Sequence, residues 1–178
     1  MANTTFDGPV RSKNGFQSIG PGSVIALTAA TDLTVADHAG RIVTMDPVGT
    51  PTAITLPTIV ATSDGASAGP GSDPNNKSTV GTTFEILFID EFTGTISTDG
   101  TDKFVGSVMI GVDDGAKKAF VPAAANDVMN LNGEAGAGNA TTGGLIGSRV
   151  KFTATADNTY MVEGLLIGDG TIATPFGN

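Results

Sequence analysis

The sequence predicts an all-β fold, an antiparallel sandwich or barrel of the jelly-roll kind, with an extended N-terminal arm and long loops. The main reason is that about eight to ten short runs alternate apolar with polar residues and are separated by Gly, Asn and Asp turn residues. A second reason is that only residues 122–131 could form a helix of any length, and Asn126 and Asp127 weaken it. We find no internal repeat at a fixed period, which disfavours a propeller or a solenoid.

The strands are expected wherever the alternating runs occur along the chain. They cover residues 24–27, 33–35, 42–45, 52–57, 82–90, a short piece around 96, 104–112, 150–154 and 160–167, and residues 117–122 and 127–132 are further short pieces. Turns are predicted at residues 37–40, at 99–100 and at 156–158, because Asp, Asn and Gly gather there. Pro57 ends its strand or places that strand at a sheet edge, because proline has no backbone N–H to donate.

The segment TTFEILFID gives the strongest candidate for a core strand. Its side chains Phe84, Ile86 and Phe88 fall on one face. Leu87 and Ile89 fall on the other face. Because large apolar groups occupy both faces, we expect both faces of this strand to be covered.

The chain divides into an arm and one domain. Residues 1–20 are polar with scattered Gly and Pro, and they are interpreted as an extended N-terminal arm. Residues 21–178 are predicted to form a single β domain, since a chain of this length can bury one core. Residues 61–79 hold no large apolar side chain and are expected to form a long exposed loop.

Composition excludes several classes of partner. The net charge of -9 argues against nucleic acid, because such binding depends on Lys and Arg neutralising phosphates. No apolar stretch approaches the roughly 18 residues that would span a membrane. There are no cysteines, so disulfides and thiolate metal sites are excluded. The N-terminal residues lack an apolar signal region, so we expect a protein made without an export signal.

No residue pattern in the chain predicts catalysis. His38 is the sole histidine and is expected to be a solvated turn residue. Glycoside hydrolysis is disfavoured, because the chain has no Trp and one Tyr to stack a sugar. An adventitious calcium site stays open as an alternative, because four carboxylates could supply its oxygen ligands: Asp99, Asp102, Asp113 and Asp114. Neither the stretch DGTD nor the stretch DDG, which hold them, has the full calcium-loop pattern. We therefore expect no catalytic, cofactor-binding or metal-binding residues and no enzymatic activity.

The stretch LLIGDG near the C-terminus has the form of a strand that leads into a phosphate-binding loop. Such a loop needs a helix after its glycines, so that the phosphate meets the helix N-terminus. Residues 171–178 leave no room for one, and Pro175 lies among them. Residues 168–170 are therefore predicted to be a turn or a bulge.

Three parts of the chain carry a resemblance to a known class of protein. They are the opening ANTTFDGPVRSKNGF, the strand pair GRIVTMDPVGTPTAITLP and GTTFEILFID, and the ending GSRVKFTATADNTYMVEGLLIGDGTIATPF. These segments resemble small virion proteins of tailed bacteriophages, and the closest resemblance is to head decoration proteins, also called cement proteins. The resemblance covers most of the chain except residues 61–79.

The resemblance implies a structural protein of the virion. Such proteins are non-enzymatic, are usually trimers, and sit on the outer capsid surface at three-fold and quasi-three-fold positions. There they hold neighbouring major capsid subunits together against the pressure of the internal DNA. The resemblance thus implies a homotrimer, the major capsid protein as partner, and a location on the outer capsid surface after synthesis in the host cytoplasm.

The N-terminal arm is the expected capsid contact, with a frayed terminus as the alternative. An extended arm can add a strand to the capsid lattice through main-chain hydrogen bonds. Phe6, Val10 and Phe16 are its isolated large apolar side chains and would fill pockets in the capsid. Arg11 and Lys13 would pair with acidic capsid groups.

The C-terminal tail is a second candidate contact. Its apolar residues Ile172 and Phe176 are expected to dock either on the body of the same chain or on a neighbour in the trimer.

Two other functions stay open from the sequence. One is a different virion component, such as a head fibre or tail protein, and the other is a carbohydrate-binding β module, against which the scarcity of aromatic residues counts.

Overall fold

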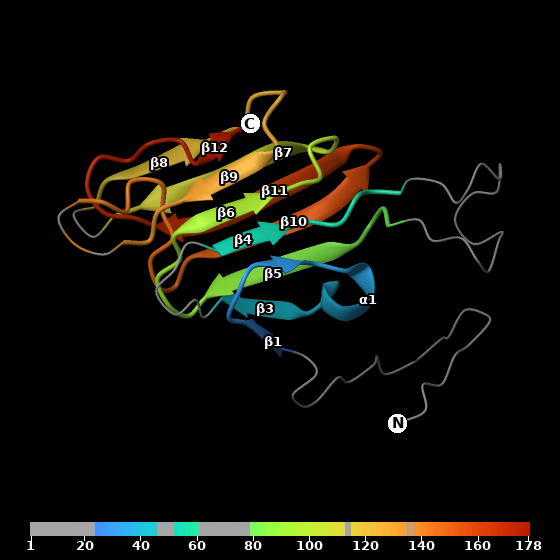
Figure 1. The fold of residues 1–178 in the computed structure, drawn as a ribbon. Coiled ribbons are helices and arrows are strands. Elements are labelled where there is room, and N and C mark those ends of the chain that lie inside the picture. Colours follow the sequence, from blue (N-terminus) through green and yellow to red (C-terminus); the bar gives the residue numbers. More distant parts are fainter. Residues whose placement is uncertain (1–23, 46–51, 61–78, 113–114, 135, 137) are drawn as a thin grey trace, which may run out of the picture.

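The chain folds into two β-sheets that lie face to face, as Figure 1 shows. The structure is a computed structural model and describes residues 24–45, 52–60, 79–112, 115–134, 136 and 138–178. Its strands are β1 (Val24–Leu27), β2 (Thr31–Asp32), β3 (Ile42–Met45), β4 (Thr52–Thr55), β5 (Thr83–Phe88), β6 (Gly94–Ser97), β7 (Lys103–Gly111), β8 (Lys117–Phe120), β9 (Val128–Leu131), β10 (Arg149–Ala156), β11 (Thr159–Ile167) and β12 (Phe176–Gly177). One short helix, α1 (Val35–His38), precedes β3. The predicted all-β sandwich is confirmed.

The strand order shows how the chain moves between the two sheets. The larger sheet has seven strands in the order β1-β3-β5-β10-β11-β7-β8, and the smaller has five in the order β12-β9-β6-β4-β2. From β1 to β6 the strands alternate between the sheets, and each runs parallel to the previous strand of its own sheet. The hairpin of β10 and β11 then lies between β5 and β7. The first half of the sandwich is therefore wound as a flattened coil, although the sequence has no fixed repeat.

Both sheets are mixed, which corrects the prediction of antiparallel sheets. β1, β3 and β5 are parallel neighbours in the larger sheet, as are β2, β4 and β6 in the smaller one. A parallel pair needs a crossover between its strands, and here a strand of the opposite sheet serves as that crossover. In the described residues the sheets do not close into a barrel, so the sandwich is the alternative that the structure shows.

The core lies between the sheets and is built from the inward side of each strand. β5 is buried at every second residue, and Phe84, Ile86 and Phe88 are all 0% exposed. Phe88 stacks on Phe92 with ring centroids 5.1 Å apart. Full burial of a side chain of this size stabilises the fold by about 1.5–3 kcal/mol. The predicted inward face of this strand is confirmed.

The opposite face of β5 is not covered, contrary to the prediction. Leu87 is only half-buried, and Ile89, which follows the strand, is 48% exposed. Glu85 lies on the same side and is also half-buried. The solvent side of the seven-stranded sheet is therefore open along this strand.

A one-turn helix replaces the strand that was predicted at residues 33–35. The Thr34 hydroxyl caps α1 by accepting the Asp37 backbone N–H at 3.2 Å, and such a cap favours a helical start. His38 is buried, and its Nδ1 accepts the Thr34 backbone N–H at 3.0 Å. The prediction of a solvated histidine is therefore wrong, because the ring folds back onto the cap of its own helix.

The candidate helix at residues 122–131 does not form. The Asn126 side chain accepts the Ala123 backbone N–H at 2.7 Å, and this local bond competes with helical pairing. Val128 then begins β9, which pairs with β6 and β12.

No helix in the described part of the chain is long and apolar enough to cross a membrane.

The C-terminal tail docks on its own chain. Ile172 and Phe176 are 6% and 8% exposed and belong to the hydrophobic core, which is one of the two alternatives expected from the sequence. β12 pairs with β9 and fixes the end of the tail to the smaller sheet. Gly170 has a φ of +73°, and a Cβ there would lie 2.6 Å from the Cα of Gly138. Residues 168–170 therefore bend the chain in close contact with another loop, which agrees with the predicted turn.

Candidate functional site

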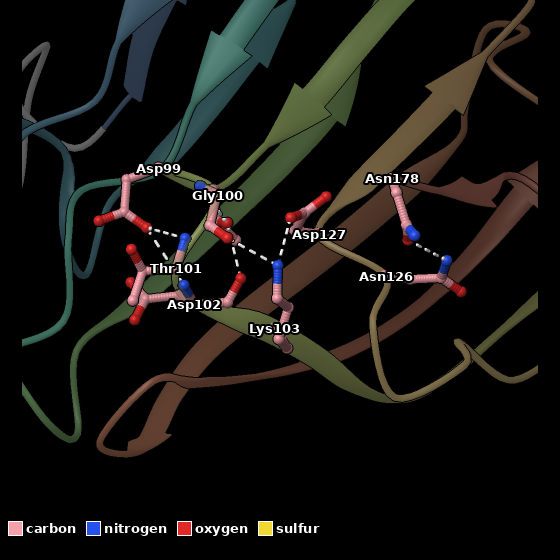
Figure 2. Close-up of polar contacts among 9 residues, drawn as sticks. Asp99, Gly100, Thr101, Asp102, Lys103, Asn126, Asp127 and Asn178 are labelled. Atoms are coloured by element: carbon pink, nitrogen blue, oxygen red, sulfur yellow. Dashed lines mark hydrogen bonds and ion pairs between the residues drawn. The ribbon is translucent and has the colours of Figure 1, made fainter.

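The turn between β6 and β7 is organised by one aspartate. Asp99 Oδ1 accepts the backbone N–H of Thr101 at 2.9 Å and that of Asp102 at 3.1 Å, as Figure 2 shows. Gly100 takes a φ of +89°, which confirms the turn predicted at these residues. Burial acts to raise the pKa of Asp99, but the two N–H groups and the Thr58 hydroxyl lower the pKa below its ordinary value of 3.8.

Asp102 is the most enclosed carboxyl group of this turn. It is 0% exposed, and its Oδ2 accepts the Ile59 backbone N–H at 2.9 Å. Its Oδ1 has no hydrogen-bond partner in the described part of the chain. Burial raises the pKa of Asp102, although the Ile59 N–H lowers it. The charges of Asp99 and Asp157 raise the pKa further, and that of Lys103 lowers it.

Three hydrogen bonds hold the segment that follows β4, one from Tyr160 of β11 and two to Asp99 and Asp102 of this turn. The Tyr160 hydroxyl donates to the Pro57 carbonyl at 2.6 Å, and the Thr58 hydroxyl donates to Asp99 Oδ2 at 2.8 Å. In the third, the Ile59 backbone N–H donates to Asp102 Oδ2. Burial raises the pKa of Tyr160, and the nearby negative charges of Asp102 and Asp99 raise it further. Tyr160 therefore stays protonated and acts as a hydrogen-bond donor.

The other side of the same turn contacts the start of β9. Lys103 Nζ donates to the carbonyl of Gly100 at 2.6 Å and forms an ion pair with Asp127 (Figure 2). Asn126 contacts the C-terminal residue Asn178, with 2.8 Å between their amide atoms. The turn therefore joins β6 and β7 to the residues that precede β9, and Asn126 connects those residues to the C-terminal tail.

In the corner formed by these contacts, Asp99 and Asp102 hold the turn and the segment after β4 in place. Both carboxylate oxygens of Asp99 already accept protein donors, and one oxygen of Asp102 does so. No group of three or more His, Cys, Asp or Glu side chains is placed to hold a metal ion in the described residues. Asp113 and Asp114, the other carboxylates considered for calcium, lie outside those residues. The chemistry of this corner is hydrogen bonding that fixes loops.

A second candidate site is the solvent side of the seven-stranded sheet, which we call the outer face. Six of the eleven exposed large apolar side chains in the described part of the chain lie on it: Val24, Ile42, Val105, Met109, Met161 and Leu165. Exposed residues on a sheet that faces water are normally polar. The outer face is therefore unusually apolar for a surface of this chain.

The register of the four middle strands arranges the outer face in three rows. Each row takes one residue from β7, β11, β10 and β5 in turn. The first row is Val105, Met161, Thr153 and Thr83. The second row is Ser107, Glu163, Lys151 and Glu85. The third row is Met109, Leu165, Arg149 and Leu87. Two apolar pairs on β7 and β11 thus lie on either side of a charged row.

The charges on the outer face are paired. Lys151 Nζ lies 3.2 Å from Glu163 Oε1, and Arg149 Nη1 lies 3.5 Å from Glu85 Oε1. These four side chains line a shallow, open depression over β10, together with Leu165 and the neighbouring glycine. Exposed pairs of this kind contribute about 0–1 kcal/mol to folding, so they do little for the stability of the single chain.

Comparisons with known proteins add no relative. A scan against protein-family models, a search of curated proteins and a search of solved structures each found no match.

The structure tests the predicted contact residues unequally. The residues of the arm lie outside the described residues: Phe6, Val10, Arg11, Lys13 and Phe16. Ile172 and Phe176 lie in the core of their own chain. Sequence reasoning missed the outer face, although apolar residues on both sides of residues 160–167 were a signal for it.

Proposed function

We propose that this chain is a structural virion protein that binds the outer surface of a tailed-phage capsid. It acts there as a decoration or cement protein, a homotrimer without enzymatic activity that stabilises contacts between major capsid subunits. The observation that carries the proposal is the edge strand β1, which follows the predicted arm and lies at the end of the seven-stranded sheet in the described residues, where a further strand can be added.

The place of β1 supports a role for the arm. β1 begins at Val24, shortly after the predicted arm of residues 1–20, and forms one edge of the seven-stranded sheet. An edge strand presents unpaired backbone groups, and extended segments bind sheet edges through such groups. In a trimer three arms would bind together, so that modest single contacts add up to stable attachment.

The proposal is tested by binding to heads. Purified protein is mixed with expanded, undecorated heads of the phage that encodes it, and bound copies are counted after sedimentation. We expect saturable binding at a fixed number of copies per head, together with heads that resist heating better than undecorated ones. Heads that bind no protein, or that gain no resistance, would show that the proposal is wrong.

The arm is tested in the same assay with matched variants. Deleting residues 2–16, or replacing Phe6, Val10 and Phe16 by Ser, is expected to abolish binding while the far-UV circular dichroism of the β domain is unchanged. A variant with Ser at three polar arm positions, namely Asn3, Thr5 and Gln17, is the control and should bind like the unmodified protein. Unchanged occupancy by the deletion variant would exclude the arm as the capsid contact.

A further inference from the structure

We propose that the outer face is an interface with a second copy of this chain, related by a two-fold axis that runs parallel to the strands between β10 and β11. This contact is separate from capsid binding and from the three-fold assembly proposed above. It is argued from three properties of the outer face, namely its apolar pairs, its charge balance and its size.

The apolar pairs provide the driving force. Val105 and Met161 are direct neighbours on β7 and β11, and they are 45% and 36% exposed. Met109 and Leu165 form the second pair and are 44% and 51% exposed. Burial of apolar area contributes about 25 cal/mol for each Å² removed from water. Covering both pairs would therefore stabilise a complex.

The charge balance favours a second copy as the occupant. The whole chain carries a net charge of -9, so two copies repel each other over most of their surfaces. The ion-paired side chains of the outer face are two carboxylates and two cations, and their charges cancel: Glu85, Arg149, Lys151 and Glu163. Two acidic molecules can approach most closely where this cancellation occurs. A strongly charged partner would find no matching potential on this face.

The register sets the direction of the two-fold axis. Lys151 on β10 lies directly opposite Glu163 on β11. A two-fold rotation about a line between these strands, parallel to them, exchanges β10 with β11 and β5 with β7. Lys151 of one copy then faces Glu163 of the other, and the reverse contact forms at the same time. An axis across the strands would instead bring Glu163 against Glu163, which is repulsive.

The same rotation matches the third row. It brings the aliphatic stem of Arg149 over Leu165 of the second copy, and Leu87 over Met109. The axis leaves four strands of the sheet on one side and three on the other, so six of the seven can overlap. The overlap therefore places no two like charges of the charged row opposite each other.

The size of the outer face is sufficient for a modest interface. Six strands about 4.8 Å apart and five residues long cover a flat area on the order of 400 Å². The side chains give this area relief, so the accessible surface is larger than its flat projection. Interfaces at the small end of the standard range bury about 600 Å² on each partner. We therefore expect an association that depends on protein concentration.

The test uses charge reversal in the full chain. Sedimentation equilibrium across a concentration series should show the unmodified protein in an assembly that contains the two-fold contact. Lys151→Glu and Glu163→Lys should each halve the mass of that assembly, because each places like charges at both reciprocal contacts. Arg41→Glu and Glu134→Lys make the same charge changes at exposed positions outside the outer face and should leave the mass unchanged.

Mixing the two single variants separates a contact between copies from the ion pair within one copy. Both variants lose the internal pair, and mixing cannot restore it. In a mixed dimer, however, Glu at 151 meets Lys at 163, and Glu at 163 meets Lys at 151. An equimolar mixture should therefore recover the mass of the original assembly, as should the double variant K151E/E163K. Circular dichroism checks that each variant is folded.

Three results would overturn the proposal. They are an unmodified protein that forms only monomers or trimers at every concentration, a Lys151→Glu variant of unchanged mass, and a mixture that stays at the mass of the single variants. Trimers without the two-fold contact, an unchanged Lys151→Glu mass or an unrecovered mixture would leave capsid binding by the homotrimer intact, whereas a monomer would contradict the homotrimer as well. The two proposals can therefore fail independently.

Discussion

Replacing Asp102 by Asn should change the stability of the protein in a way that depends on pH. The free energy of unfolding of the variant, measured relative to that of the unmodified protein, should be higher at neutral pH than at pH 4. The carboxyl group is fully buried, and one of its oxygens accepts the Ile59 N–H. Asn keeps an acceptor for that N–H and cannot ionise. The substitution therefore isolates the effect of the buried charge from the effect of the hydrogen bond.

The direction of the pH dependence follows from the raised pKa. Burial raises the pKa of Asp102 in the folded protein above its ordinary value of 3.8. The folded state therefore holds the proton to a higher pH than the unfolded state does. The stabilisation is full below the ordinary pKa and is lost as the pH rises through the folded value. Because the Asp102→Asn variant has no such loss, the difference in unfolding free energy should move in its favour between pH 4 and pH 7.

The hydrogen bond is measured by a second variant, Asp102→Ala. Ile59 is buried, so its N–H has no water to replace the lost acceptor. An unsatisfied buried N–H costs about 1–3 kcal/mol. Asp102→Ala should therefore be less stable than Asp102→Asn by about that amount at every pH. In a chain of this size each kcal/mol lowers Tm by about 2–4 °C.

The assay is urea unfolding of the three proteins at several pH values, with equal m-values as the check that the same transition is compared. The reasoning would be refuted by an Asn variant that loses stability relative to the unmodified protein as the pH rises. It would also be refuted if Asp102→Ala and Asp102→Asn were equally stable, because the bond to Ile59 would then contribute nothing.

Two further substitutions test other contacts. Tyr160→Phe removes the hydroxyl that donates to the Pro57 carbonyl and leaves the ring in place, so we expect a loss of about 0.5–1.5 kcal/mol in thermal or urea unfolding; an unchanged stability would contradict the role given to this bond. Gly170→Ala is expected to cost more than about 1 kcal/mol, because the backbone there has a φ of +73° and the added Cβ would lie 2.6 Å from the Cα of Gly138; a variant as stable as the original would show that the loop can shift at little cost.

The sequence predicted the positions of the strands well because burial alternates along them. The pattern at Phe84, Ile86 and Phe88 depends only on which residues face the core, and this is a local property. Pairing is not local. β1 and β3 are parallel because β2 of the opposite sheet lies between them in the chain, and alternation within a strand has no information on that route.

The polar sites were harder to predict for a similar reason. The turn at Asp99 was predictable, since an aspartate can bond backbone groups two or three residues away. The burial of Asp102 was not, because the N–H that it accepts belongs to Ile59, on the segment after β4. His38 was misjudged because its partner is the cap of a helix that the pattern at residues 33–35 did not indicate.

On the outer face, the fold decides which apolar residues of an alternating strand become neighbours in space. Met161 and Leu165 alternate with buried residues, so either face of this strand could have been the inward one. The core selects the side of Tyr160, because that side meets the smaller sheet. The parallel pairing with β7 then places Val105 and Met109 beside them, and four scattered apolar residues become two adjacent pairs. A single sandwich has only two layers and cannot cover both faces of its larger sheet. A cover for these pairs would have to come from beyond the two sheets, and the balanced charges between them favour the proposed second copy of the same chain.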